Sequence, residues 1–241
     1  MTELSFNDFG ETDYLTVYNW MQDQRISIAL NKSKESINFV EHPSVFTLGT
    51  NAESNNVLIN ENNRAALNID LVHVDRGGDV TCHNKGQLVA YPLLNLKKRK
   101  IKPVEYVRML ECILINVLKK YNISGEQNPG NPGIWVGNNK IASIGISIKK
   151  GITSHGISLN INNDLSIFNY INTCGIRDLE VTSMHKVLNK TIDISQIKLI
   201  MMNELQSLLG LQTLNSNNEE VLLKQIALKK TLVRSKKFDS N

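Results

Sequence analysis

Alternation of apolar and polar residues is typical of half-buried β-strands, and the middle of this chain shows it twice. Residues 140–148 (KIASIGISI) and 153–161 alternate over most of their length, which predicts a pair of half-buried antiparallel strands. Shorter apolar stretches predict further strands at 37–42, 45–49, 71–76, 87–94 and 133–136. The stretch 71–76 runs into Gly77-Gly78, where the chain must turn or approach another group closely.

Apolar residues three and four positions apart predict helices elsewhere. Residues 12–30 fit an amphipathic helix, and Pro103 is well placed to begin another. The apolar stripe of this second helix comprises Val107, Leu110, Leu114, Val117, Leu118 and Tyr121, with Cys112 on the opposite face. A third stripe, closed by Gly210, comprises Ile197, Ile200, Met201, Leu205 and Leu208. A last helix is expected from about Glu219 into a basic tail.

The mixture of hairpin-forming strands and helices predicts an α+β fold with a mixed, largely antiparallel sheet flanked by helices. A length of 241 residues favours one domain with a small appendage. We therefore expect a catalytic domain over 1–214, with its core motifs in 35–185, and a C-terminal helix and basic tail over 215–241.

Composition and charge are those of an ordinary soluble protein. Hydrophobic residues make up 41% of the chain and the net charge is only +4, which gives no indication of nucleic-acid binding. No stretch is apolar for long enough to span a membrane, and the N-terminal residues do not resemble a secretory signal. Three cysteines without a CxxC spacing indicate free thiols rather than disulfides or zinc. We expect a cytoplasmic protein that acts as a monomer, away from membranes and nucleic acid.

Four segments concentrate glycine, histidine, lysine and cysteine at the ends of predicted strands: RGGDVTCHNKGQ (76–87), NNKIASIG (138–145), HGISLNI (155–161) and INTCGI (171–176). Each also has an ordinary structural interpretation. A Gly-Gly pair is commonly a tight turn, Lys140 could belong to a hairpin turn, and a free cysteine such as Cys174 is commonly a small buried residue. The sequence lacks GxxxxGK, GxGxxG, GxSxG and HExxH, which excludes the commonest nucleotide, hydrolase and zinc motifs.

Taken together and in this order, the segments resemble the octanoyl-carrier-protein:protein octanoyltransferases, the lipoate-protein ligase B family. The motifs are RGGxVTxHxxGQLV, KIAxIG, HGxxLNI and CGI, preceded by EHPSVFTLG at 41–49. The resemblance covers roughly residues 35 to 185. It implies the fold of the biotin and lipoate-protein ligase catalytic domains, with the acyl pocket on the sheet.

The resemblance also implies the roles of individual residues. Cys174 would be the nucleophile that carries the acyl group as a thioester, and Lys140 would lower the pKa of that thiol and transfer its proton. The acyl substrate would be bound by Arg76, Gly77, Gly78, Asp79, Val80, Thr81, Cys82, His83, Ser143, Ile144, Gly145, Gly156, Ile157 and Ser158.

Two departures from the family pattern are Thr173 where proline is usual, and Asn84-Lys85 where Gly-Pro is usual. We expect them to affect the turn that presents Cys174 and the loop over the pocket.

The implied reaction moves an octanoyl group from octanoyl-acyl carrier protein to a lysine of a lipoyl domain, in 2-oxoacid dehydrogenases and the glycine cleavage H protein. It needs no cofactor and no metal, because a thioester is already activated. Three alternatives remain: an amidotransferase of the same fold that moves octanoyl or lipoyl groups between proteins, a lipoate or biotin ligase, and a non-catalytic acyl-binding protein. The ligases would require ATP and a phosphate-contacting loop, and RGGDVTCH does not match the GRGRxG-like segment of a biotin ligase.

Two further features have both an ordinary and a functional interpretation. Cys82 precedes His83, but neighbouring residues of a strand point to opposite faces, so we interpret Cys82 as a filler rather than a rival nucleophile. The basic runs at 97–100 and 229–237 are commonly plain surface. They could also attract acidic acyl carrier proteins and lipoyl domains.

Overall fold

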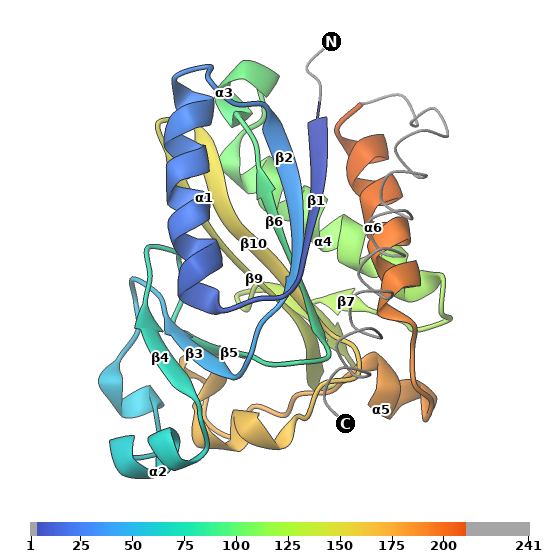
Figure 1. Cartoon of the computed structure of the whole chain (residues 1–241). Coiled ribbons are helices and arrows are strands. Elements are labelled where there is room, and N and C mark those ends of the chain that lie inside the picture. Colours follow the sequence, from blue (N-terminus) through green and yellow to red (C-terminus); the bar gives the residue numbers. More distant parts are fainter. Residues whose placement is uncertain (1–3, 211–241) are drawn as a thin grey trace, which may run out of the picture.

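The computed structural model of the protein describes residues 4–210, which form two β-sheets with helices on both sides of the larger one (Figure 1). The larger sheet has the strand order β1-β2-β6-β10-β9-β8-β7. Its strands are β1 (Leu4–Glu11), β2 (Glu35–Glu41), β6 (Gln87–Leu93), β7 (Glu126–Gln127), β8 (Gly133–Val136), β9 (Asn139–Lys149) and β10 (Ile152–Asn160). The smaller sheet has the order β4-β3-β5, formed by β3 (Val45–Leu48), β4 (Asp70–His73) and β5 (Val80–His83).

Strand pairing is antiparallel throughout the larger sheet except between β1 and β2, which run parallel. In the smaller sheet, β3 pairs with β4 in parallel and with β5 antiparallel. The predicted α+β fold with a mixed, largely antiparallel sheet is therefore confirmed.

Helices cover both faces of the larger sheet. Helix α1 (Tyr14–Ala29) packs on β6 and β10, and the side chain of Asp13 caps its first turn by accepting from the Thr16 amide. Helices α4 (Pro103–Lys119) and α6 (Ile194–Leu208) pack against each other on the opposite face (Figure 1). The short helices are α2 (Glu61–Ala66), α3 (Leu96–Arg99) and α5 (Met184–Leu188). The three long helices lie where the apolar spacing predicts them.

Two details of the predicted pattern are wrong. Strand β10 is antiparallel as expected, but it is buried along its whole length rather than half-buried. The reason is that α1 covers one of its faces and α4 the other. Leu208 does not belong to the buried stripe of α6, because it is 37% exposed at the last turn, whereas Met202 and Gln206 are buried.

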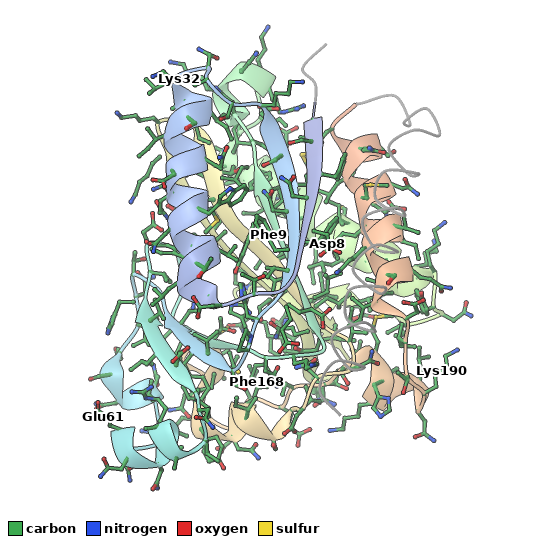
Figure 2. All side chains as sticks on the ribbon, in the orientation of Figure 1. Asp8, Phe9, Lys32, Glu61, Phe168 and Lys190 are labelled. Atoms are coloured by element: carbon green, nitrogen blue, oxygen red, sulfur yellow. The ribbon has the colours of Figure 1, made fainter. Side chains whose placement is uncertain are left out.

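Strands β1 and β7 were not expected from the sequence. In β1 the pairing register shifts between Asp8 and Glu11, which interrupts the alternation of side chains. Asp8 is a residue of β1 on the side that faces α6 (Figure 2), and its carboxylate forms a buried ion pair with Lys198 of α6, at 3.0 Å. This pair joins the edge of the sheet to α6.

The predicted C-terminal helix and basic tail lie outside the described residues, and so does the basic run at 229–237. The proposed boundary at residue 214 stays a prediction. Of the run at 97–100, Arg99 forms a buried ion pair with Glu35 and is not a free surface charge, whereas the three lysines are exposed. Within residues 4–210, no helix has both the length and the apolar character needed to cross a membrane.

Candidate active site

A cavity of about 340 Å³ lies on the α1 side of the larger sheet, between β9 and β10 and the segment that leads into β5. Thirteen of the fourteen predicted substrate-binding residues line it, together with both predicted catalytic residues. The exception is Cys82, which is buried in a separate apolar cluster with Phe46 and Phe168. Burial raises the pKa of the Cys82 thiol, which agrees with its interpretation as a filler.

Lys140 and Cys174 meet at this cavity although they are far apart in the chain. The Lys140 Nζ atom lies 3.2 Å from Cys174 Sγ and donates a second hydrogen bond to the Pro132 carbonyl, at 2.8 Å. The side chain is only 2% exposed, and its ammonium lies 5.6 Å from the centre of the Trp135 ring. The amine is therefore held at the thiol by a carbonyl, an aromatic face and burial.

The strand that carries Lys140 is itself tied to the segment that follows Cys174. The Lys140 amide donates to the Glu180 carbonyl, and the Thr182 amide donates to the Lys140 carbonyl, both at 2.9 Å. These bonds add a short parallel bridge at the start of β9. The contact between amine and thiol is thus supported by the backbone.

Cys174 lies on a sharp turn. It adopts a left-handed conformation (φ +59°) within a 3₁₀ turn, η3 (Thr173–Gly175), and Gly175 follows with φ +73°. A Cβ on Gly175 would lie 2.7 Å from Asp79 Oδ2, so only glycine fits beside that carboxylate. Thr173, the residue that replaces the usual proline, is buried, and its carbonyl accepts from the Ile176 amide to close the turn.

Arg76 brings a second cation to the cavity. Its guanidinium is 6% exposed and donates to the Thr47 carbonyl and hydroxyl and to the Gly77 carbonyl. In the described part of the chain no carboxylate forms an ion pair with it. Burial lowers the pKa of Arg76, and the nearby Cys174 partly offsets that effect by favouring the charged form. The lining beside the thiol therefore combines the Arg76 cation with the Asp79 carboxylate, which lies against Gly175.

The floor of the cavity consists of small residues on two paired strands. Ser143 lies opposite Ser158, and Gly145 lies opposite Gly156. A Cβ on Gly145 would lie 2.9 Å from Arg76 Cδ, so the glycine leaves space for the arginine above the sheet. The predicted segments 143–145 and 156–158 therefore come together as one smooth surface on which a chain of methylene groups can lie.

One side of the cavity is closed by the predicted His83 together with two aromatic side chains that were not predicted from the sequence. Tyr14 and Tyr91 line it, and the Tyr14 ring stacks on His83 at 5.9 Å between centroids. His83 Nδ1 bonds to Gln87 Oε1 at 2.7 Å, and His42 Nε2 bonds to the Tyr91 hydroxyl at 3.0 Å. Burial lowers the pKa of His42 to about 4 and that of His83 to about 3, so both rings are neutral at pH 7.

His155 is also part of the lining, and it is bonded to Asp75 at 2.8 Å through Nε2. Burial lowers the pKa of His155, so the neutral ring donates its Nε2–H to the carboxylate. That hydrogen bond, with further bonds from Lys149 and Arg25, holds the pKa of Asp75 well below its usual range. The motif HGISLNI pointed to this histidine, but nothing in the sequence pointed to Asp75 as its partner.

The second departure from the family pattern lies outside the lining of the cavity. Asn84 and Lys85 form the turn between β5 and β6, where Asn84 bonds to Asp164 and Asn163 and the exposed Lys85 pairs with Glu11. Neither residue lines the cavity, and the effect of this departure on a loop over the pocket stays a prediction. Among residues 4–210, no three His, Cys, Asp or Glu side chains are grouped so that they could hold a metal ion.

Comparisons with known proteins identify the family of the chain. Residues 16–206 match the family model of the lipoyl protein ligase A/B catalytic domain. An octanoyltransferase from Alkaliphilus metalliredigens is 42% identical over 161 residues, covering 66% of this chain and 74% of the relative. One from Pelobacter propionicus is 34% identical over 203 residues, covering 84% and 94%.

Solved structures share the fold. A lipoate-protein ligase A bound with ATP has a TM-score of 0.69 at 14% identity, covering 92% of this chain and 94% of that chain. A biotin protein ligase from Aquifex aeolicus has a TM-score of 0.50 at 11% identity, covering 87% and 70%. The predicted likeness to these catalytic domains is confirmed. The chain belongs to the lipoyl protein ligase A/B catalytic-domain family and, within it, to the octanoyltransferases, which are acyltransferases.

Proposed function

We propose that this chain transfers an octanoyl group from octanoyl-acyl carrier protein to the ε-amine of a lysine on a lipoyl domain, through a thioester on Cys174. The observation that carries the proposal is the 3.2 Å contact between Lys140 Nζ and Cys174 Sγ at the edge of a cavity with a smooth floor. A volume of about 340 Å³ lies within the range of small-molecule sites.

In the first step, the Cys174 thiol gives its proton to the Lys140 amine, and the thiolate attacks the carbonyl carbon of the octanoyl thioester. The bond between that carbon and the sulfur of the carrier protein breaks, and the released sulfur takes the proton from Lys140. Arg76 favours the anionic forms because its guanidinium is buried beside the cavity.

In the second step, the ε-amine of the acceptor lysine attacks the acyl-Cys174 carbonyl carbon. An amide forms, the carbon–sulfur bond of Cys174 breaks, and Lys140 transfers a proton from the attacking amine to the departing thiolate. Because an amide is more stable than a thioester, the sequence of steps proceeds without ATP. Lys140 is suited to this exchange because it contacts the sulfur and is shielded from water.

The proposed acceptors are the lipoyl domains of 2-oxoacid dehydrogenases and the glycine cleavage H protein. The proposed location is the cytoplasm, where cysteines stay reduced as a nucleophilic thiol requires. The amidotransferase alternative would use the same residues and would differ in taking the acyl group from another lipoylated or octanoylated protein.

The experiment is to incubate the protein with octanoyl-acyl carrier protein and to measure the intact mass. We expect one octanoyl group on the wild type, none on Cys174→Ala, and one on Cys112→Ala, because Cys112 is exposed on α4 away from the cavity. Adding a lipoyl domain should move the mass to the domain. An adduct that persists in Cys174→Ala, or that maps to Cys82, would contradict the proposal. A faster reaction with an octanoylated protein as donor would favour the amidotransferase.

A further inference from the structure

His155 has a backbone conformation that is unusual for its place. It lies in the middle of β10 but has φ +57°, in the left-handed region that residues other than glycine rarely adopt within a strand. A strained residue held in place by its surroundings is a reason to look for a role in function. The proposed transfer reaction assigns none to His155.

The unusual backbone brings the imidazole to the cavity side of the sheet. The ring lies 5.7 Å from Tyr18, on α1, and 6.3 Å from Tyr91, between centroids, and it is 2% exposed. Leu159, which strand alternation would place on the same face as His155, belongs instead to the apolar core that includes residues of α4. The left-handed backbone therefore places the His155 imidazole against the cavity.

A network of hydrogen bonds and ion pairs centred on Asp75 holds the imidazole in place. His155 Nε2 donates to Asp75 Oδ1, and Asp75 Oδ2 accepts from Arg25 at 3.1 Å and from Lys149 at 2.7 Å. Ser147 and Ser154, the paired residues next along the floor, bond to Asp75 and Arg25 respectively. The smooth floor thus ends at a charged, hydrogen-bonded cluster.

The distance from the thiol end to this cluster suits an eight-carbon chain. Ser143 begins the floor near Lys140, and His155 is opposite Ile146, three residues farther along β9. Three residues of a strand span about 10 Å. An extended eight-carbon chain, with seven zigzag carbon–carbon bonds of about 1.5 Å, reaches about 9 Å.

A longer chain would have to displace the ring from Asp75 or force methylene groups into the charged cluster. The first change costs Asp75 one of its hydrogen bonds and the second places apolar groups against charges, and either is less favourable than leaving an apolar chain end in water. We propose that His155, positioned by Asp75, is the end wall of the acyl cavity and limits the acyl group to about eight carbons. This inference rests on the proposed function, because it assumes that the acyl group is bound between Cys174 and this wall.

The test is a competition between acyl chains in one tube. Wild-type protein is mixed with equal amounts of octanoyl-, decanoyl- and dodecanoyl-acyl carrier protein, and the early adduct masses give the ratio of kcat/KM values directly. The key variant is His155→Gly, since glycine accepts φ +57° and removes the ring. His155→Asn, which also tolerates this conformation, is the second variant if the first does not fold. His73→Asn, at an exposed histidine of β4, is the matched control.

We expect the wild type and His73→Asn to favour octanoyl, and His155→Gly to raise the decanoyl-to-octanoyl ratio about tenfold, because each methylene that finds room contributes roughly a factor of four. An unchanged ratio in both His155 variants, or a wild type that accepts all three chains equally, would overturn the inference. A wild type that forms no adduct on Cys174 with any chain would instead reject the proposed function.

Discussion

Lys140 reaches Cys174 through a space that exists only because residue 133 has no side chain. A Cβ on Gly133 would lie 2.7 Å from Lys140 Cε, and the backbone there has φ +129°. The adjacent Pro132 carbonyl accepts a hydrogen bond from the same amine. The loop before β8 therefore positions the lysine, although it contributes no reacting group.

Replacing Lys140 by methionine tests its role in proton transfer. We expect Lys140→Met to form the octanoyl adduct on Cys174 at least about 100-fold more slowly at pH 7, the range found when a general base is removed. The rate should recover in part as the pH is raised, because hydroxide can then deprotonate the thiol. The measurement is the adduct formation rate by intact mass from pH 6 to 10.

Lys119→Met is the matched control, since Lys119 is an exposed lysine in the last turn of α4. It should behave like the wild type across the pH range. If Lys140→Met were as fast as this control at pH 7, the amine would have no part in activating the thiol.

The proposed reacting residues, Cys174 and Lys140, are predicted through the family resemblance, because the family motifs contain these residue types themselves. The backbone conformations of the residues at the cavity cannot be predicted in the same way. The left-handed backbone of His155 and of Cys174 depends on contacts with distant residues, among them Met21, whose sulfur accepts from the His155 amide. Asp75 directly precedes the Gly-rich motif that begins at Arg76, yet the hydrogen-bond partners of Asp75 come from α1, β9 and β10.

At the scale of elements, strands β6 and β10 approach each other unusually closely at Gly156. A Cβ there would clash with the Ala90 carbonyl oxygen and lie 2.7 Å from Pro92 Cδ. Both obstacles belong to the rigid, buried strand β6, so neither can move away cheaply. The glycine lets the centre of the sheet form and keeps the cavity floor smooth.

We expect Gly156→Ala to lower the free energy of unfolding by about 3 kcal/mol or more, as overpacking of a buried backbone contact does. Gly137→Ala is the comparison. Gly137 has φ +58° with open space around it, so the expected cost is only about 1 kcal/mol of backbone strain. Urea unfolding followed by circular dichroism measures both values. Equal losses would show that the close approach at Gly156 carries no special cost.

The elements that sequence patterns missed are those whose pattern is broken or too short. Strand β1 alternates only as far as the register shift after Asp8, and β7 has only two residues, too few to form a pattern. Conversely, β9 was predicted because its alternation of apolar and polar residues extends over more than four residue pairs. The long helices were predicted because their apolar stripes extend over more than two turns. Burial of β10 on both faces depends on α1 and α4 and has no local signature.

At the scale of the whole molecule, the three buried histidines His42, His83 and His155 gather around one cavity, whereas the buried ion pairs Asp8–Lys198 and Glu35–Arg99 lie elsewhere. His42 and His83 are both buried and neutral, and their rings face Tyr14, Tyr91 and Gln87. Such neutral histidines make the stability of the fold depend on pH, because the unfolded chain can protonate them and the folded chain cannot.

The direction follows from the two pKa values. In the unfolded chain each histidine titrates near its ordinary value of 6.5, whereas in the fold burial lowers the pKa of His42 to about 4 and that of His83 to about 3. Between these limits the unfolded state binds more protons, so the free energy of unfolding falls as the pH is lowered.

From pH 7 to pH 5 we expect a loss of about 2 kcal/mol per histidine. Urea unfolding at the two pH values measures it. His42→Gln, whose amide can donate to the Thr12 carbonyl and accept from the Tyr91 hydroxyl in place of the ring, should lose about half of this dependence. Equal unfolding free energies of the wild type at pH 7 and pH 5 would show that these rings are not held neutral by the fold.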